Sequence, residues 1–326
     1  MTILVGIDEA GFGPILGPLV VSSATFRLPQ ELVSADLWHV LRRSLANRRK
    51  RLAGRLLVAD SKKAHSKSLG TKHLERTVLA AMRCLGKQPV SLAELMTLLC
   101  PDCLERLREY PWYRDAGNHM IAGADPDKAI ASSVLADDMA SHGVNLLDLR
   151  SCCFDVAFYN KMVRNVRNKA SVLFTATCGL IKHALDNFTE DDLCIIADRQ
   201  GGRVHYRKSL LRMFPEMELK ILREDPKASS YELRRPTYKS EGPQCVTRLH
   251  FVVGADERFL PVSLASMVSK YLRELLVSSI NGYFVSFAAD LKPTAGYWKD
   301  GLRFIEDLKT NLPHIPFDGD QLVRCR

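Results

Sequence analysis

The chain has 326 residues, of which 46% are apolar and 25% charged, a balance typical of a folded globular protein and unlike that of disordered or fibrous chains. No run of about 18 uncharged apolar residues occurs, so the sequence predicts no membrane-spanning helix. Lys and Arg outnumber Asp and Glu by 46 to 37, and the resulting net charge of +9 favours a polyanionic partner such as nucleic acid.

The chain is expected to begin with two strands joined by a tight loop. Residues 3–7 are an apolar run, and residues 18–27 are rich in β-branched side chains. Three glycines and one proline lie between them, and a second proline begins the later run, which predicts a turn and hence a hairpin. The first residues carry no basic segment and soon reach two acids, so we expect no secretory signal.

The rest of the chain alternates between helical and extended patterns. Helices are predicted at 71–85, 169–186 and 261–277, and strands at 193–198, 217–222 and 248–254. Residues 97–150 are expected to form a largely helical insertion, and residues 226–246 an exposed loop or hairpin. This order predicts an α/β fold with a mixed sheet flanked by helices.

Nine cysteines, an odd number, are scattered through the sequence. They favour reduced thiols and a cytoplasmic location. Cys100 and Cys103 have the spacing of half a zinc site. Their only candidate partners, Cys152 and Cys153, lack the two-residue gap, so free thiols are the favoured interpretation.

Two segments concentrate basic residues without any acid. Residues 37–59 contain seven Lys or Arg residues, and residues 199–215 contain five. A solvated helix face or a loop explains such a segment as well as a phosphate-binding surface does. Both interpretations stay open at this point.

Four acids follow or end predicted strands: Asp8, Glu9, Asp198 and Asp256. A single acid there is commonly a turn or a cap, but acids from several strand ends meet at one edge of a sheet. Clustered carboxylates repel one another unless a cation lies among them, and Mg²⁺ and Mn²⁺ prefer oxygen ligands. Asp8 and Glu9 would point to opposite faces of an ideal strand, so we expect a bend there.

Five segments together resemble the ribonuclease HII family, the type 2 ribonucleases H. The most specific is residues 6–18, GIDEAGFGPILGP. The others, in chain order, are Asp60–Lys63 (DSKK), Ala197–Asp198, Gly254–Asp256 with the helix that follows to Lys270, and Ala295–Tyr297. The resemblance covers residues 1–90 and 150–305.

The resemblance implies a ribonuclease H-like catalytic domain over residues 1–305, with a tail at 306–326. It implies a metal-dependent endonuclease that cleaves RNA in RNA–DNA hybrids, or at ribonucleotides embedded in duplex DNA, and leaves 5′-phosphate and 3′-hydroxyl ends. Asp8, Glu9, Asp198 and Asp256 would be the catalytic residues and would hold two Mg²⁺ or Mn²⁺ ions. The residues implied to contact nucleic acid are Gly11, Phe12, Gly13, Lys62, Lys63, Lys270 and Tyr297.

The sequence departs from the family pattern at several positions. Phe12 replaces the arginine of a Gly-Arg-Gly segment, and Trp298 replaces the proline that follows the tyrosine. A nuclease of the same fold that acts on duplex RNA or branched DNA is therefore one alternative. A nucleic-acid-binding protein without catalysis is another, although it would have no need of four acids beside phosphates.

Overall fold

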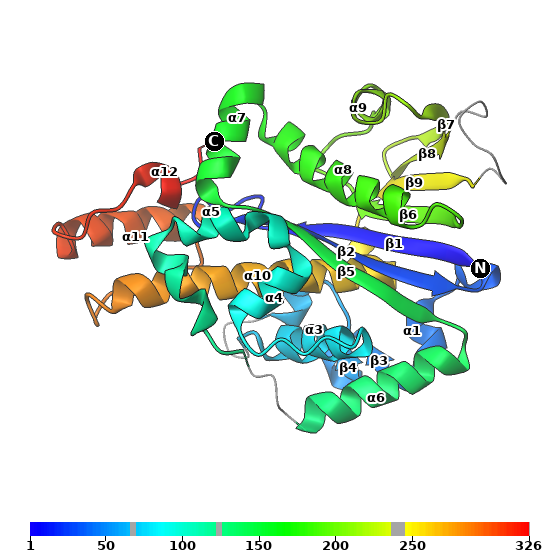
Figure 1. Cartoon of the computed structure of the whole chain (residues 1–326), viewed down its shortest axis with the longest axis horizontal. Coiled ribbons are helices and arrows are strands. Elements are labelled where there is room, and N and C mark those ends of the chain that lie inside the picture. The colour runs from blue at the N-terminus through cyan, green and yellow to red at the C-terminus, as the bar shows by residue number, and fades with distance from the viewer. Residues whose placement is uncertain (66–69, 122–125, 236–244, 326) are drawn as a thin grey trace.

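A seven-stranded mixed sheet runs through the computed structural model, which describes residues 1–65, 70–121, 126–235 and 245–325 (Figure 1). Its strand order is β5–β2–β1–β6–β9–β8–β7. The strands are β1 (Thr2–Ala10), β2 (Leu19–Leu28), β5 (Asn145–Phe154), β6 (Asp192–Asp198), β7 (Glu218–Glu224), β8 (Ala228–Arg234) and β9 (Thr247–Val252); β3 (Leu45–Ala46) and β4 (Leu56–Leu57) form a separate pair. Neighbours β1, β6 and β9 are parallel, and the remaining pairs of the large sheet are antiparallel.

Helices cover both faces of this sheet. The long α10 (Leu260–Val285) lies along one face against β1 and β2, and α7 (Val156–Val166) and α8 (Lys169–Asn187) lie on the other (Figure 1). The remaining helices are α1 (Leu37–Val40), α2 (Ser61–Ala64), α3 (Lys72–Cys84), α4 (Leu92–Leu99), α5 (Leu104–Arg108), α6 (Pro126–Ser141), α9 (Arg207–Met213), α11 (Trp298–Asn311) and α12 (Gly319–Leu322). The predicted α/β fold with a mixed sheet is confirmed. Within the described ranges, no helix combines the length and apolarity needed to cross a bilayer.

The alternation of side chains along β1 separates two apolar cores. Ile3, Val5 and Ile7 pack on the side of α8, whereas Leu4 packs on the side of α10. Gly6 faces α10 so closely that a Cβ atom there would lie 2.1 Å from the carbonyl carbon of Pro261. Glycine at this position therefore allows the start of α10 to lie directly on the strand.

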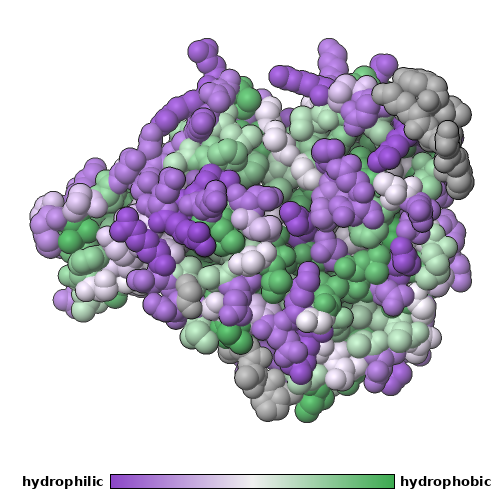
Figure 2. Space-filling view, viewed as in Figure 1, coloured by the Kyte–Doolittle hydropathy of each residue, from purple (hydrophilic) through white to green (hydrophobic). Residues whose placement is uncertain are grey.

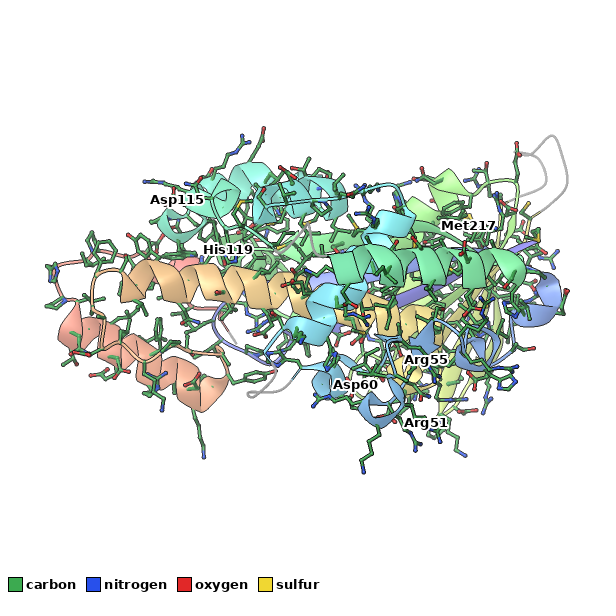
Figure 3. The ribbon with its side chains drawn as sticks, turned by 90° about the horizontal axis from the view of Figure 1, so that it is seen from below. Arg51, Arg55, Asp60, Asp115, His119 and Met217 are labelled. Atoms are coloured by element: carbon green, nitrogen blue, oxygen red, sulfur yellow. The ribbon has the colours of Figure 1, made fainter. Side chains whose placement is uncertain are left out.

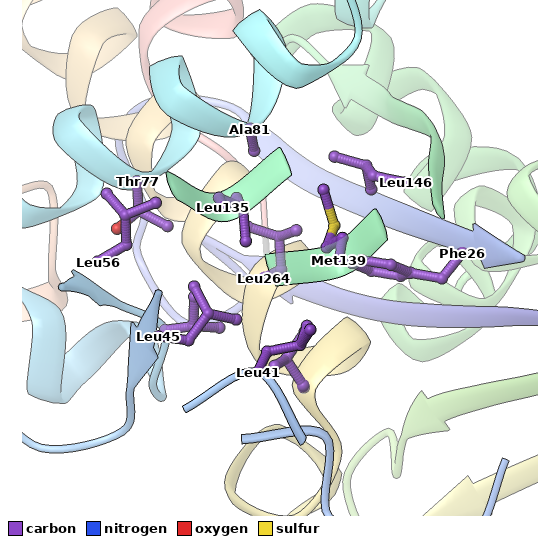
Figure 4. A pocket seen from close by; sticks show the side chains of 12 residues that line it. Phe26, Leu41, Leu45, Leu56, Thr77, Ala81, Leu135, Met139, Leu146 and Leu264 are labelled. Atoms are coloured by element: carbon purple, nitrogen blue, oxygen red, sulfur yellow. The ribbon is translucent and has the colours of Figure 1, made fainter. Parts of the chain in front are cut away.

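The core on the α10 side is closed by α3, α6 and the segment around β3 and β4. Figure 4 shows Phe26, Leu135 and Leu264 converging there from β2, α6 and α10 around a cavity of about 10 Å³. This is a gap in packing rather than space for a ligand, because it has the size of a single water molecule. On the face shown in Figure 2, hydrophilic side chains cover most of the surface, and hydrophobic ones gather over the side of β5 and α6.

Two strands lie in segments that the sequence did not predict as plain strands. Residues 145–154, partly inside the predicted helical insertion, form the edge strand β5 paired with β2. Residues 228–234, within the segment predicted as an exposed loop or hairpin, form the buried strand β8, which pairs antiparallel with β9; residues 236–244 of that same prediction lie outside the described part. Pairing with neighbouring strands makes both β5 and β8 extended.

The end of the chain also packs against the domain. The boundary expected between 305 and 306 falls inside α11, which continues to Asn311. Beyond α12, the backbone amide of Arg324 donates to the carbonyl of Ile15, 2.8 Å away. The segment around Val323 and Arg324 is therefore packed against the glycine-rich loop that follows β1.

Replacing Gly6 by Ala is expected to destabilise the protein by about 3 kcal/mol or more, because the new methyl group would overlap the backbone of α10. Urea unfolding measures the change. Gly13→Ala is the matched control, since nothing lies within 4 Å of a Cβ atom there. Equal stability of the two variants would contradict the close approach of β1 and α10.

Candidate active site

The parallel strands β1, β6 and β9 end at one edge of the sheet, and each brings an acid there. Asp8 lies near the end of β1, Asp198 ends β6, and Asp256 lies in a short 3-10 helix, Ala255–Glu257, that links β9 to α10. Ile7 pairs with Ala197, so Asp8 and Asp198 are neighbours on adjacent strands. Strand alternation places both on the α10 face, opposite Ile7 and Ala197 of the other core.

Glu9 joins this group without the bend that the sequence predicted. Strand β1 pairs regularly with β2 through Glu9 and Ala10. The Glu9 side chain nevertheless hydrogen-bonds to Asp8 and interacts electrostatically with Asp198 and Asp256. Its carboxyl reaches the group from the last residues of the strand, so no distortion of the strand is needed.

Several groups hold these carboxylates in place. Ser266 of α10 hydrogen-bonds to the Asp8 side chain, and Ser269 Oγ donates to the Asp8 carbonyl at 3.0 Å. The backbone amide of Ala255 donates to Asp198 Oδ1 at 2.7 Å. The serines of α10 and the turn after β9 therefore fix the acids of β1 and β6.

Burial and mutual repulsion make these carboxyls hard to ionise. Burial first, and then the charges of Glu9 and Asp198, raise the pKa of Asp8 well above its usual range. Burial and Asp198 raise the pKa of Glu9 to about 7, and burial, Asp60 and Asp198 raise that of Asp256 to about 6. Burial likewise raises the pKa of Asp198. Such a group gains stability from a cation placed among its members.

Asp60 belongs to the same group, although the sequence analysis singled out only the lysines that follow it. It caps α2 by accepting from the backbone amide of Lys62 at 3.0 Å, and its charge raises the pKa of Asp256. Its place in the DSKK segment was the signal available. From the sequence alone, a carboxylate that precedes two lysines is more readily interpreted as a helix cap than as a member of a carboxylate cluster.

The two lysines of this segment have different surroundings. The charge of Lys62 lowers the pKa of Glu9, Asp198 and Asp256, so its ammonium group lies near all three carboxyls. Lys63 is exposed, and its Nζ lies 2.6 Å from Glu257 Oε1. Lys62 is thus the cation of the carboxylate cluster, which we define as Asp8, Glu9, Asp60, Asp198 and Asp256.

A hollow of about 420 Å³ opens beside Asp60 and Asp256. Its other walls are Trp38, Asn47, Arg48, Ala59, Lys63, Glu257 and Ser263. Arg48 comes from the basic segment 37–59, and Figure 3 shows Arg51 and Arg55 on the same side of the molecule as Asp60. This segment therefore places positive charge beside the acids, as the phosphate-binding interpretation requires.

The second basic segment, 199–215, is partly structural. Arg199 is buried and donates to the carbonyls of Pro226 and Asp225 and to Ser229 Oγ. Arg203 stacks on the rings of Phe174 and Tyr206, at 5.0 and 5.4 Å. These two arginines support β8 and the α8 side of the core, so fewer cations of this segment remain to meet a polyanion.

The glycine-rich loop after β1 rests on a buried arginine of α10. A Cβ atom at Gly11, where φ is +92°, would lie 2.7 Å from the Arg273 side chain. Arg273 Nη2 donates to the carbonyls of Leu16 and Ala295, and its guanidinium lies 5.8 Å from the Tyr297 ring. The Tyr297 ring is 52% exposed. Arg273 therefore links the glycine-rich loop to Tyr297, which is predicted to contact nucleic acid.

The other predicted contacts lie in different surroundings. Phe12 packs partly against the α8-side core, and Lys169 Nζ lies 5.2 Å from its ring. Gly13 is exposed. Lys270 is mostly buried and pairs with Glu274 at 2.6 Å. The structure therefore does not bring Lys270 into the carboxylate cluster.

Three of the four cysteines considered for zinc are close together. Cys103 hydrogen-bonds to Cys100 and Cys153, and these bonds lower the Cys103 pKa to about 5. Cys152 faces the opposite side of β5, toward Gly179. Of the cysteines in the described ranges, none is in a disulfide, in agreement with the favoured free thiols.

The carboxylate cluster has the chemistry of a magnesium or manganese site, because its donors are all oxygens. Across the described ranges, however, no three His, Cys, Asp or Glu side chains are arranged closely enough to hold a metal ion. The donor types therefore fit such an ion.

No family model matches the chain, and no curated protein sequence is similar to it. Solved structures similar to it include ribonuclease HII from Archaeoglobus fulgidus in a complex with PCNA, with a TM-score of 0.45 and 14% identity over 99% of this chain and 94% of that one. Ribonuclease H2 from Pyrococcus horikoshii OT3 gives 0.40 and 13% over 98% and 92%. Bst-RNase HIII in complex with Mn²⁺ gives 0.45 and 13% over 99% and 66%.

The raised pKa values predict how stability of the metal-free protein varies with pH. Glu9 ionises near pH 4.5 when unfolded but near 7 when folded, so stability falls as pH rises through this window. Glu9→Gln removes that penalty and should stabilise the protein at pH 8 by about 1–3 kcal/mol, with little effect at pH 4.5.

Thermal unfolding in a metal chelator at the two pH values measures the difference. Glu31→Gln, at an exposed acid outside the cluster, is the control and should change neither value. A Glu9→Gln protein that melts like wild type at pH 8 would contradict the expected destabilisation by the ionised Glu9 carboxylate.

Proposed function

We propose that this chain is a metal-dependent endonuclease that cleaves RNA in RNA–DNA hybrids or at ribonucleotides embedded in duplex DNA. The observation that carries the proposal is the carboxylate cluster at the ends of three parallel strands. Its members repel one another and are held in place by serines and backbone amides. A fold that keeps five acids together at such cost gains from a bound cation.

The residues that would hold two Mg²⁺ or Mn²⁺ ions are Asp8, Glu9, Asp198 and Asp256. When bound, such ions supply an activated water and stabilise the leaving oxygen in phosphodiester hydrolysis. Lys62 offers a cation to a substrate phosphate beside these acids. Arg48, in the wall of the hollow, would meet a phosphate further along the strand.

The ribonucleotide would be recognised at the glycine-rich loop and the exposed Tyr297. Gly11 brings the backbone close to the end of β1, and backbone groups can meet a 2′-hydroxyl, which distinguishes RNA from DNA. The Tyr297 ring offers a flat face for stacking on a sugar or base. The expected products have 5′-phosphate and 3′-hydroxyl ends.

A nuclease of the same fold with another substrate is the second candidate. It is favoured by Phe12, which packs toward the core and offers no charge to a phosphate. Digestion of an RNA–DNA hybrid, DNA with one ribonucleotide, duplex RNA and branched DNA in parallel separates the candidates. Cleavage of only the last two would overturn the proposed substrate.

Asp8→Asn and Asp256→Asn should each reduce cleavage by about 100-fold or more, because each removes a charge from the cation-binding group. The variants should remain folded, as judged by circular dichroism. Single-turnover cleavage with Mn²⁺ measures the loss, and Asp290→Asn, at an exposed acid outside the cluster, is the control. Near-wild-type cleavage by Asp8→Asn would refute the assignment.

Arg48→Ala should weaken binding to duplexes and reduce the slope of log affinity against log salt by about 1, the loss of one phosphate contact. Fluorescence anisotropy at several salt concentrations measures this slope. Arg43→Ala, an exposed arginine of the same segment outside the hollow, is the matched control. Identical slopes for the two variants would favour the interpretation of residues 37–59 as a solvated surface that does not contact phosphates.

A further inference from the structure

A second hollow, of about 190 Å³, lies beside the glycine-rich loop. Residues from four parts of the chain line it: Phe12, Gly13, Pro14, Ile15, Tyr159, Lys169, Arg324 and Cys325. Two of these residues are cations and none is an acid. The lining is therefore electropositive, with an aromatic wall on either side.

Arg324 is the buried cation of this hollow, with 4% of its surface exposed. Its Nη2 donates to the carbonyl of Pro14, and its guanidinium lies 4.9 Å from the centre of the Tyr159 ring. Among the described residues, Nε and Nη1 find no hydrogen-bond partner. A buried guanidinium with idle donors and no paired carboxylate is costly unless an anion compensates it.

Lys169 supplies the second cation of the hollow. It is exposed, and no ion pair is found for it in the described part of the chain. It is also the first residue of the 19-residue α8, whose N-cap Asn168 accepts from the backbone amides of Ala170 and Ser171. The positive end of the helix dipole is therefore added to the charge of Lys169.

We propose that this hollow binds a phosphate group of a nucleic-acid strand between Lys169 and Arg324. The Phe12 ring would then pack on the adjoining sugar. The inference rests on the proposed function for the source of the phosphate and adds a binding site at the glycine-rich loop. The loop itself is held to Arg324 through Pro14, so an occupied hollow would also steady the loop.

The test measures binding without cleavage, in a metal chelator. Anisotropy of a labelled DNA duplex is titrated with wild type, Lys169→Ala and Arg324→Gln. Each variant should bind about tenfold more weakly, the loss of one charge-assisted contact, and Lys169→Ala should lower the salt slope by about 1. Lys182→Ala, further along α8 and paired with Asp186, is the matched control and should bind like wild type.

Inorganic phosphate and deoxyadenosine monophosphate are titrated in parallel to distinguish a strand from a free phosphate. If Lys169→Ala weakens only the small anions and leaves duplex binding unchanged, the assignment to a strand is overturned. Duplex affinities of Lys169→Ala and Lys182→Ala that are both like wild type also overturn it. Lys169 is exposed, so its variant decides the question even if Arg324→Gln fails to fold.

Cleavage assays with Mn²⁺ separate this proposal from the proposed function. Weakened binding by Lys169→Ala together with no cleavage of any substrate by wild type supports the phosphate site and refutes the nuclease. Full cleavage by wild type, together with wild-type duplex affinity of both Lys169→Ala and Arg324→Gln, supports the nuclease and refutes the phosphate site.

Discussion

The contact between β1 and α10 at Gly6 is the constraint on which the site depends. Because position 6 carries no side chain, the backbone of Pro261 and Val262 lies directly over the strand. This approach brings Ser266 and Ser269 to Asp8, two residues further along β1. It also places the turn that carries Asp256 against the end of β6. A larger side chain at position 6 would push α10 away from β1 and so separate the acids that this contact brings together.

Two buried arginines hold the glycine-rich loop in place. Arg273, on α10, and Arg324, near the end of the chain, are both buried and both donate to carbonyls of the glycine-rich loop. Burial lowers the pKa of Arg324 to about 10, which still leaves the guanidinium charged at neutral pH. The loop therefore follows directly from the strand that carries Asp8 and Glu9, and two buried cations hold it. This arrangement suits a ligand whose phosphates meet cations at the loop and whose neighbouring groups meet the carboxylate cluster.

The sequence predicted most of the elements that position the site, because their patterns are strong. The apolar run at 3–7 and the β-branched residues of 18–27 identified β1 and β2, and the run that ends at Asp198 identified β6. The prediction failed at 145–154, part of which was expected to be helical, and it left 228–234 open between a loop and a hairpin. Strand β8 is extended because β7 and β9 lie on either side of it, and β5 because β2 pairs with it.

By itself, the sequence determined the α/β class, the strands followed by acids and the resemblance carried by residues 6–18, since these depend on local periodicity and residue type. Only the tertiary structure decided which charged residues act together. It placed Asp60 with the acids, paired Lys270 with Glu274 and gave Arg199 a structural role. It also brought Arg324 to Pro14, which lies 310 residues earlier in the chain. Such contacts depend on how sheets and helices pack, and no spacing along one chain encodes the distance between two charges that folding brings together.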